Sequence, residues 1–424
     1  MNNSFFQSRS GSKALKLTLL ILAGESIFFL PFVLARVFRP TFLAVFEITN
    51  LELGSLYSVY GVVAMVAYFL GGPLADRFSP RLLIASALLS TGFGGFCLAF
   101  AHSLSSLLWL YGFWGMTTIL LFWAALIKAT RSIGGSYSQG RAFGFLEGGR
   151  GFIAAFAGSV AVGIFSFYLN NESEPATLAE QQMAFRYVIY FFSGWVIVIG
   201  LLIWFFFRKT DHPKTERHNK ISLKQMTLIA KEPKIWLQAI IIVCAYVGYK
   251  ITDDFSLLAK DVLAYSDVEA AQVGALALWM RMIVAITAGF LADRIAQSSK
   301  VISWGFATMI FSGLAIGSGL LPHQIPYYYI FVILSTCVGV YAVRGLYFSL
   351  IQEALIPLEI SGTSIGLISV IGFTPDIFMG PLMGYFLDEN PGALGHQLVF
   401  MLLAGFAFIG LLATTWFRKL NRAS

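Results

Sequence analysis

The chain has 424 residues, of which 57% are hydrophobic and 12% are charged, and its formal net charge is +7. A soluble domain typically carries roughly 25% charged residues, so this chain has too few charges to cover the surface of a soluble globule. The composition excludes a soluble enzyme, a disordered protein and a secreted disulfide scaffold, and it indicates a protein whose main solvent is lipid.

Twelve apolar stretches approach the length of about 20 residues that a membrane-spanning helix needs. The first stretch, from about Leu17 to Phe38, is too long for a cleaved signal peptide, so we predict the first membrane helix there. The predicted spans are residues 17–38, 53–75, 82–101, 105–127, 142–168, 186–207, 234–260, 270–292, 299–320, 326–350, 361–387 and 397–417. The sequence thus predicts an all-α membrane protein with twelve transmembrane helices.

A long polar stretch, Arg208 to Lys234, lies between the sixth and seventh predicted spans. It predicts an N-terminal six-helix bundle over 1–208, a cytoplasmic linker over 209–233 and a C-terminal six-helix bundle over 234–424. Most of the 29 lysines and arginines fall in the two tails, this linker and the loops on the same side. The positive-inside rule therefore predicts that both termini are cytoplasmic. The net charge reports topology and does not indicate nucleic-acid binding.

Both halves carry the tetrapeptide Leu-Ala-Asp-Arg at the inner end of their second predicted helix, which indicates two parallel repeats. The glycine before it permits close helix approach, the aspartate can accept hydrogen bonds from a neighbouring helix, and the arginine can form an ion pair across the cytoplasmic gap. The predicted gating residues are Gly72, Asp76, Arg77 and Arg81 in the first copy, and Gly289, Asp293 and Arg294 in the second.

Twelve spans, a central linker and this repeated motif together resemble the major facilitator superfamily, whose motif is Gly-x-x-x-Asp-Arg-x-Gly-Arg-Arg/Lys. Ser79 and Pro80 depart from the pattern in the first copy, and Ala296 departs from it in the second. Within the superfamily, residues 139–151 and 384–392 are similar to the bacterial YihN-type carriers, which are grouped loosely with nitrate/nitrite-type transporters. The resemblance implies two pseudo-symmetric six-helix bundles, transport by alternating access and a bacterial inner membrane, but it names no substrate.

Cations inside predicted spans are costly and usually face a partner or a water-filled cavity. Arg36 and Lys250 lie in the first helix of each half, at nearly equivalent positions of the repeat. In placement and charge they resemble the paired basic residues of the superfamily's organic-phosphate carriers. Arg281 lies near the middle of the eighth span. We predict that these three cations bind substrate, together with Tyr246 and Tyr249.

Each cation also has an alternative role: Arg281 can have a gating role or pair with a group on another helix. Arg36, near Arg39 at the outer boundary, can extend to the lipid headgroups. Lys250 can be neutralised by Asp253 and Asp254, three and four residues later on its own helix face.

Two carboxylates, Glu25 and Asp376, lie deep in predicted spans and are candidates for proton coupling, although each can instead pair with a cation. Glu147 and Arg150 are predicted to form a structural or gating ion pair, with substrate binding as the alternative. Arg344 is predicted either to form a structural or gating pair with an acid at the inner gate, for which Glu353 is the candidate, or to contact the substrate.

The remaining signals argue against catalysis. The three cysteines lack metal-ligand spacing, and His102, His212, His218, His323 and His396 are all predicted in loops, so we expect no metal, no cofactor and no enzyme activity.

The predicted function is a secondary active transporter of a small polar metabolite, with an anion favoured and proton coupling as an option. A neutral solute, multidrug or metabolite efflux, and a non-transporting membrane sensor are the alternatives. The expected partners are the substrate, lipid and protons, without nucleic acid, and we expect a monomer. Direction, substrate and coupling ion stay open.

Overall fold

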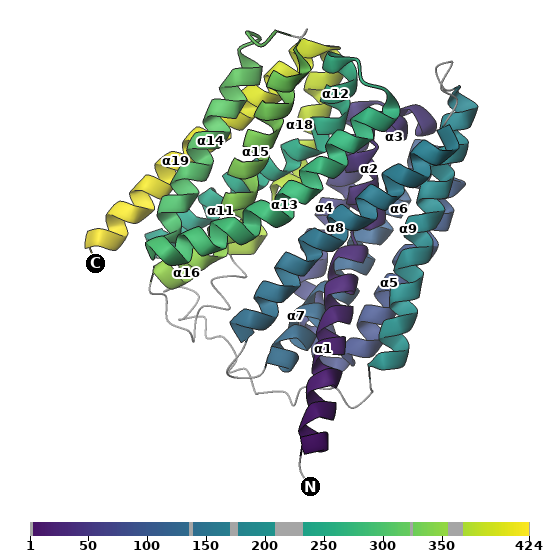
Figure 1. The fold of residues 1–424 in the computed structure, drawn as a ribbon, viewed down its shortest axis with the longest axis vertical. Coiled ribbons are helices and arrows are strands. Elements are labelled where there is room, and N and C mark those ends of the chain that lie inside the picture. The colour runs from purple at the N-terminus through teal and green to yellow at the C-terminus, as the bar shows by residue number, and fades with distance from the viewer. Residues whose placement is uncertain are drawn as a thin grey trace. The chain divides into compact units, whose positions relative to one another are not determined.

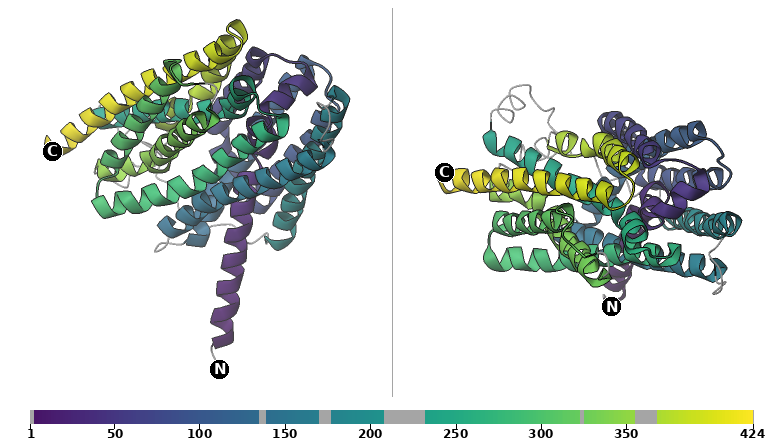
Figure 2. Two further views of the ribbon diagram at one scale, coloured as in Figure 1. Left: turned by 45° about the horizontal axis from the view of Figure 1, so that its top comes forward. Right: turned by 90° about the horizontal axis from the view of Figure 1, so that it is seen from above.

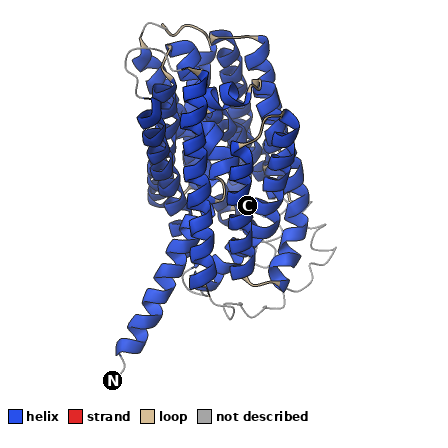
Figure 3. Ribbon diagram, turned by 90° about the vertical axis from the view of Figure 1, so that its right-hand side faces the viewer, coloured by secondary structure: helices blue, strands red, loops and turns tan. Residues whose placement is uncertain are grey.

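The computed structural model describes residues 3–134, 139–169, 177–207, 232–322, 325–354 and 368–423, and every regular element within these ranges is a helix (Figures 1 and 3). The chain divides into two compact units, residues 1–48 with 59–216, and residues 49–58 with 217–424. The boundaries predicted for the two six-helix bundles, 1–208 and 234–424, are not tested by this division and remain predictions. The predicted linker, 209–233, lies outside the described residues except for its last two positions.

The first unit holds the helices from the N-terminus to the central linker. Its elements are α1 (Asn3–Ser26), η1 (Phe29–Val33), α2 (Leu34–Val37), α3 (Arg39–Phe46), most of α4 (Asn50–Arg77), α5 (Pro80–Ala99), α6 (Leu104–Gly115), η2 (Met116–Trp123), α7 (Ala124–Gly134), α8 (Gln139–Leu169) and α9 (Leu178–Phe206).

The second unit holds the start of α4 and all later helices. These are α11 (Pro233–Ile251), η3 (Thr252–Asp254), α12 (Phe255–Leu263), α13 (Asp267–Ile295), α14 (Ser298–Gly317), α15 (Pro326–Leu346), η4 (Tyr347–Ser349), α16 (Leu350–Glu353), α18 (Pro375–Glu389) and α19 (Ala393–Ala423).

By length and composition, twelve helices of the described chain are able to cross a membrane, which confirms the predicted number. Some ends differ from the prediction. The sixth span begins at Leu178 instead of 186, because Thr177 and Glu180 form a capping box that starts the helix earlier. The twelfth span begins at Ala393 instead of 397, and the described part of the eleventh begins at Ile368.

Small residues let the helices of each unit pack closely. In the second unit α14 and α19 run side by side (Figures 1 and 2). A Cβ atom added to Gly313 of α14 would come within 2.8 Å of the carbonyl oxygen of Phe400 in α19. Packing of backbone against backbone is the way that helices associate where lipid removes the hydrophobic driving force between them.

Four spans of the described chain contain a change of helix type. The first contains the π-helical turn η1, and the fourth contains the longer π-helical segment η2. The seventh contains the 3-10 turn η3 between α11 and α12, and the tenth contains the 3-10 turn η4 between α15 and α16. Such local changes redirect side chains, and they are frequent at functional sites. At η3 the two consecutive residues Asp253 and Asp254 contact different partners, Lys250 and His396 respectively.

One histidine lies elsewhere than expected. His396 was predicted in a loop, and this prediction is wrong: the earlier start of α19 places it in the first turn of that helix, where it is 1% exposed. His102 lies in the connection between α5 and α6, as predicted. The loop predictions for His212, His218 and His323 fall outside the described residues.

Candidate functional site

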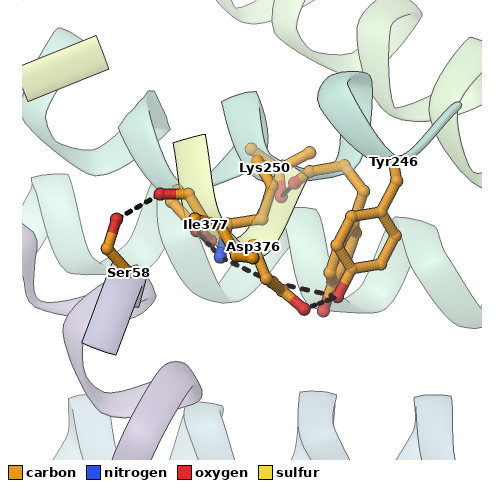
Figure 4. A network of polar contacts seen from close by, with 8 residues as sticks. Ser58, Tyr246, Lys250, Asp376 and Ile377 are labelled. Carbon is orange, nitrogen blue, oxygen red and sulfur yellow. Dashed lines mark hydrogen bonds and ion pairs between the residues drawn. The ribbon is translucent and has the colours of Figure 1, made fainter. Parts of the chain in front are cut away.

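A buried polar cluster occupies the middle of the second unit, where α11 meets α18. Lys250 lies in the last turn of α11 and is 2% exposed. Its Nζ atom lies 3.4 Å from Oδ1 of Asp376 and 3.5 Å from Oδ2 of Asp253. The hydroxyl of Tyr246 donates to Asp376, with its oxygen 3.0 Å from Oδ2 and 3.2 Å from Oδ1 (Figure 4). The lysine is therefore held between two carboxylates.

The local sequence explains why these groups meet. Tyr246 and Lys250 are four residues apart and so share one face of α11. Asp376 follows Pro375 in the first turn of α18, where the positive end of the helix dipole favours a carboxylate.

The first turns of α4 also border the cluster. The ammonium group of Lys250 lies 4.5 Å from the centre of the Tyr57 ring, within the range of a cation–π interaction. Ser58 donates a hydrogen bond to the backbone carbonyl of Ile377 in α18 (Figure 4). A Cβ atom at Gly54 would overlap Gly380, so this contact is one of backbone against backbone. Residues 49–58 belong to the second unit for this reason.

Arg344 of α15 adds a second cation to the same set of aromatic side chains. Its guanidinium carbon lies 3.5 Å from the centre of the Tyr249 ring and 5.5 Å from that of Tyr246. Its Nη1 atom is buried and has no hydrogen-bond partner among the described residues. Arg281 of α13 is 7% exposed and lies within electrostatic range of Arg344.

The predicted ion pair of Arg344 with Glu353 is not formed. Glu353 instead accepts hydrogen bonds from the backbone amide and the hydroxyl of Ser299, at the start of α14. The arginine lies in α15 beside Tyr249 of α11, so the two side chains belong to different surroundings.

Arg36 lies in α2, in the first unit, and is 1% exposed, while Arg39 at the start of α3 is 3% exposed. A side chain that reached the lipid headgroups would be exposed on the protein surface. The alternative that Arg36 extends to the headgroups is therefore wrong. The local alternative for Lys250 holds in part, since Asp253 contacts it, whereas Asp254 contacts His396.

A second buried ion-pair network lies in the first unit. Nε of Arg150 lies 3.1 Å from Oε2 of Glu25, and Nη1 lies 2.7 Å from Oε1 of Glu147. The guanidinium group also lies 5.7 Å from the ring of Phe28 and 5.5 Å from that of Trp123. Glu25 is thus paired with an arginine, which is the alternative to proton coupling that was considered for it. The predicted pair of Glu147 with Arg150, three residues apart, is present.

The repeated motif makes different contacts from those expected. Lys128 of α7 lies 2.9 Å from Oδ1 of Asp76, and the guanidinium carbon of Arg81 lies 4.5 Å from the centre of the Trp204 ring. A Cβ atom at Gly72 or Gly289 would meet nothing within 4 Å. The expected close helix approach at these glycines is therefore absent among the described residues. Arg77, Asp293 and Arg294 are exposed at the ends of their helices.

The cluster of the second unit is suited to binding and charge exchange. No group of three or more His, Cys, Asp or Glu side chains in the described chain has the geometry of a metal site. Arg344 presents a buried hydrogen-bond donor, and Lys250 holds two carboxylates that a competing anion can replace.

Of the five residues predicted to bind substrate, Lys250, Arg281, Tyr246 and Tyr249 lie in this part of the second unit, and Arg36 belongs to the first unit. Neither Tyr57 nor the stacking of Arg344 on Tyr249 was predicted from the sequence. Spacing along the chain carries no signal for contacts between distant helices. The position of Arg344 within an apolar span was the one available indication.

The family model described as Major Facilitator Superfamily matches residues 18–378. The inner membrane protein YihN of Escherichia coli strain K12 is 29% identical over 404 residues, covering 93% of this chain and 92% of that protein. These matches confirm the resemblance derived from the motif and the spans.

Two solved structures share the fold. A bacterial homologue of the human lysosomal transporter Spinster, in an inward-facing and unoccupied conformation, aligns with a TM-score of 0.75 at 16% identity, covering 96% of this chain and 98% of its own. The nucleoside transporter NupG, as a mutant, aligns with a TM-score of 0.71 at 14% identity, covering 95% and 99%. Both confirm the predicted fold class.

Proposed function

The chain belongs to the major facilitator superfamily and is a secondary transporter, and on that premise we propose that its cargo is a small organic anion. The anion binds in the second unit, between Arg344, Arg281 and Lys250, with Tyr246 and Tyr249 packing against it. Arg36 of the first unit stays a separate candidate for substrate binding, as the sequence predicts. Transport proceeds by alternating access around this site.

One observation carries the proposal: Nη1 of Arg344 is buried without a hydrogen-bond partner among the described residues. A buried guanidinium donor left unsatisfied is costly, so a site of this kind is completed by an acceptor from a ligand. Arg281 lies near enough to repel Arg344 electrostatically, and an anion between the two would offset that repulsion. Carboxylates and phosphates can accept two parallel hydrogen bonds from a planar guanidinium group.

The contacts of Lys250 also support an anionic cargo, because the lysine can exchange a carboxylate partner for a substrate anion. It is shared by Asp253 and Asp376, and Tyr246 holds Asp376 in place. When Asp376 takes up a proton, its attraction to the lysine weakens and the lysine becomes available to a substrate anion. Asp376 is therefore the proposed proton-coupling residue. Glu25 is the second candidate for proton coupling, although Arg150 already compensates its negative charge.

The test is counterflow in proteoliposomes, with a panel of carboxylates, phosphates and sulfonates and neutral polyols as the comparison. Arg344→Gln should abolish exchange of the anion that the wild type moves. Arg186→Gln is the matched control, because Arg186 is an exposed arginine of α9 in the other unit. It should leave exchange unchanged.

The other functions considered give distinct outcomes. Exchange of the neutral compounds alone would overturn the anion proposal and favour a neutral solute. Exchange of bulky apolar cations would favour multidrug efflux. A protein that moves none of these compounds would favour a non-transporting sensor.

The proposed location is a bacterial inner membrane, where the name of the YihN relative places that protein, with both termini cytoplasmic and the protein as a monomer. A reporter enzyme that is active only outside the cytoplasm, fused after Ser424, should remain inactive. An active fusion would reverse the proposed topology.

A further inference from the structure

Three titratable side chains of the second unit form a cluster that the proposed site does not use. His396 of α19 lies between Asp254 of η3 and Asp261 of α12. Its Nδ1 atom lies 2.7 Å from Oδ2 of Asp254, and its Nε2 atom lies 3.3 Å from Oδ2 of Asp261. The ring stands between the carboxylates, so the three groups do not converge on one point as metal ligands do.

The cluster runs from the surface of the unit into its interior. The side chain of Asp261 is 35% exposed, that of His396 is 1% exposed and that of Asp254 is fully buried. The second oxygen of Asp254, Oδ1, is buried and has no hydrogen-bond partner among the described residues. Asp254, at the buried end of the cluster, therefore has an acceptor oxygen that is free of described partners and can bind a proton.

Hydrogen-bond chemistry makes this cluster a carrier of protons. If both carboxylates are ionised, both ring nitrogens must donate, and the ring is an imidazolium ion. A neutral ring donates from one nitrogen only, so the carboxyl group opposite the other nitrogen must then itself be protonated. In either form the cluster holds one proton more than a neutral ring with two ionised carboxylates.

We propose that Asp261, His396 and Asp254 form a proton relay between the surface of the second unit and its interior. With Asp261 protonated and the ring protonated on Nδ1, the O–H bond of Asp261 breaks as an N–H bond forms on Nε2. The Nδ1–H bond then breaks as an O–H bond forms on Asp254. One proton leaves Asp261 and one arrives on Asp254. The ring ends protonated on Nε2, and it must rotate or transfer back before the next cycle.

The inner end of this relay adjoins the proposed site, and its role in coupling rests on the proposed function. Asp254 directly follows Asp253, whose Oδ2 lies 3.5 Å from Nζ of Lys250. The 3-10 turn η3 sends these two neighbouring carboxylates to opposite partners, one to the histidine and one to the lysine. The charge on Asp254 is therefore placed to influence the ion pairs of Lys250.

Other charged groups on the elements packed around His396 are already engaged or distant. Lys260 of α12 pairs with Asp267 of α13, and Asp388 of α18 accepts from the backbone amides of Asn50 and Leu51. Glu389 is exposed at the end of α18, and α14 carries Lys300 at its opposite end. On α11, Lys250 contacts Asp253 and Asp376. The two carboxylates of the relay are thus the acids that contact the ring.

A first experiment tests the relay without any knowledge of the cargo. The full chain, with isotope-labelled histidine, is placed in lipid nanodiscs, and the ring nitrogens of His396 are identified by the signals that His396→Gln removes. We expect an imidazolium ion or exchange between the two tautomers, with a change in Asp261→Asn. A neutral ring fixed in one tautomer across the range in which histidine titrates, and unaffected by Asp261→Asn, would overturn the relay.

A second experiment measures proton movement in proteoliposomes that contain a pH-sensitive dye, driven by the anion panel described above. His396→Gln and Asp261→Asn should lower proton flux about tenfold or more, because a missing acid–base group removes a step of transfer. Anion counterflow should be retained. Asp261→Asn, at the partly exposed end, is the variant least disruptive to folding, and the exposed His102→Gln is the matched control.

The outcomes separate the two proposals. Counterflow with unchanged proton flux in both variants would overturn the relay and leave the proposed function standing. Absence of anion counterflow in the wild type would overturn the proposed function, while the ring nitrogens of His396 would still decide the relay.

Discussion

Arg344 stacks on Tyr249, with its guanidinium carbon 3.5 Å from the ring centre, and one of its terminal nitrogens is buried without a hydrogen-bond partner among the described residues. The ring fixes the plane of the guanidinium group and thereby the direction in which its donors point. This arrangement supports the proposal that Arg344 binds an anion.

The first prediction concerns this arginine. Arg344→Gln removes a charged donor, and hydrogen bonds to charged groups contribute about 1.5–3 kcal/mol, so the KM for the anion should rise by roughly 10- to 150-fold. Arg344→Lys keeps the charge but loses the planar stacking on Tyr249, and it should fall between the wild type and Arg344→Gln. Initial rates of counterflow at varied concentration measure both. Equal KM values in all three proteins would remove Arg344 from the site.

The second prediction separates transport from coupling. Asp376→Asn removes one of the carboxylates that contact Lys250, keeps the contact with Asp253, and removes a group that can bind a proton. Accumulation of the anion under an imposed pH gradient should be lost, while exchange without a gradient is retained. Glu25→Gln serves as the comparison, because its carboxylate is paired with Arg150. If Glu25→Gln alone abolishes gradient-driven accumulation, the coupling group lies in the first unit.

The third prediction concerns the buried pair of Glu25 and Arg150. Arg150→Met leaves Glu25 buried without its guanidinium partner, and breaking a buried pair costs about 3–5 kcal/mol. The double variant Glu25→Gln with Arg150→Met should recover most of the loss, since the buried charge of Glu25 is removed together with its partner. Thermal unfolding in detergent measures the stability. Glu147→Gln should have a small effect, because that side chain is 61% exposed.

The fourth prediction concerns helix packing in the second unit. Gly313→Ala places a Cβ atom 2.8 Å from the carbonyl oxygen of Phe400 and 2.9 Å from the amide nitrogen of Ala404. Forcing α14 away from α19 should lower stability by about 1–3 kcal/mol. Gly405→Ala is the control, because a Cβ atom there meets nothing within 4 Å and alanine favours the helix. A melting temperature unchanged by Gly313→Ala would contradict the close contact.

The amino-acid sequence by itself determined the fold class, the number of spans and the family. Apolar length is a local property, so the twelve spans were found from composition alone, with errors confined to helix ends such as Leu178 and Ala393. The repeated motif is likewise contiguous in the chain, and the family match over residues 18–378 agrees with it.

The tertiary structure alone decided which buried charges meet. Glu25 and Arg150 are 125 positions apart, and Tyr246 and Asp376 are 130 apart. Whether such groups touch depends on how each helix is rotated about its axis and on which helix packs beside it. An apolar span carries no periodic signal for either. His396 shows the same point: four additional residues at the start of α19 changed it from an expected loop histidine into the buried centre of a proposed relay.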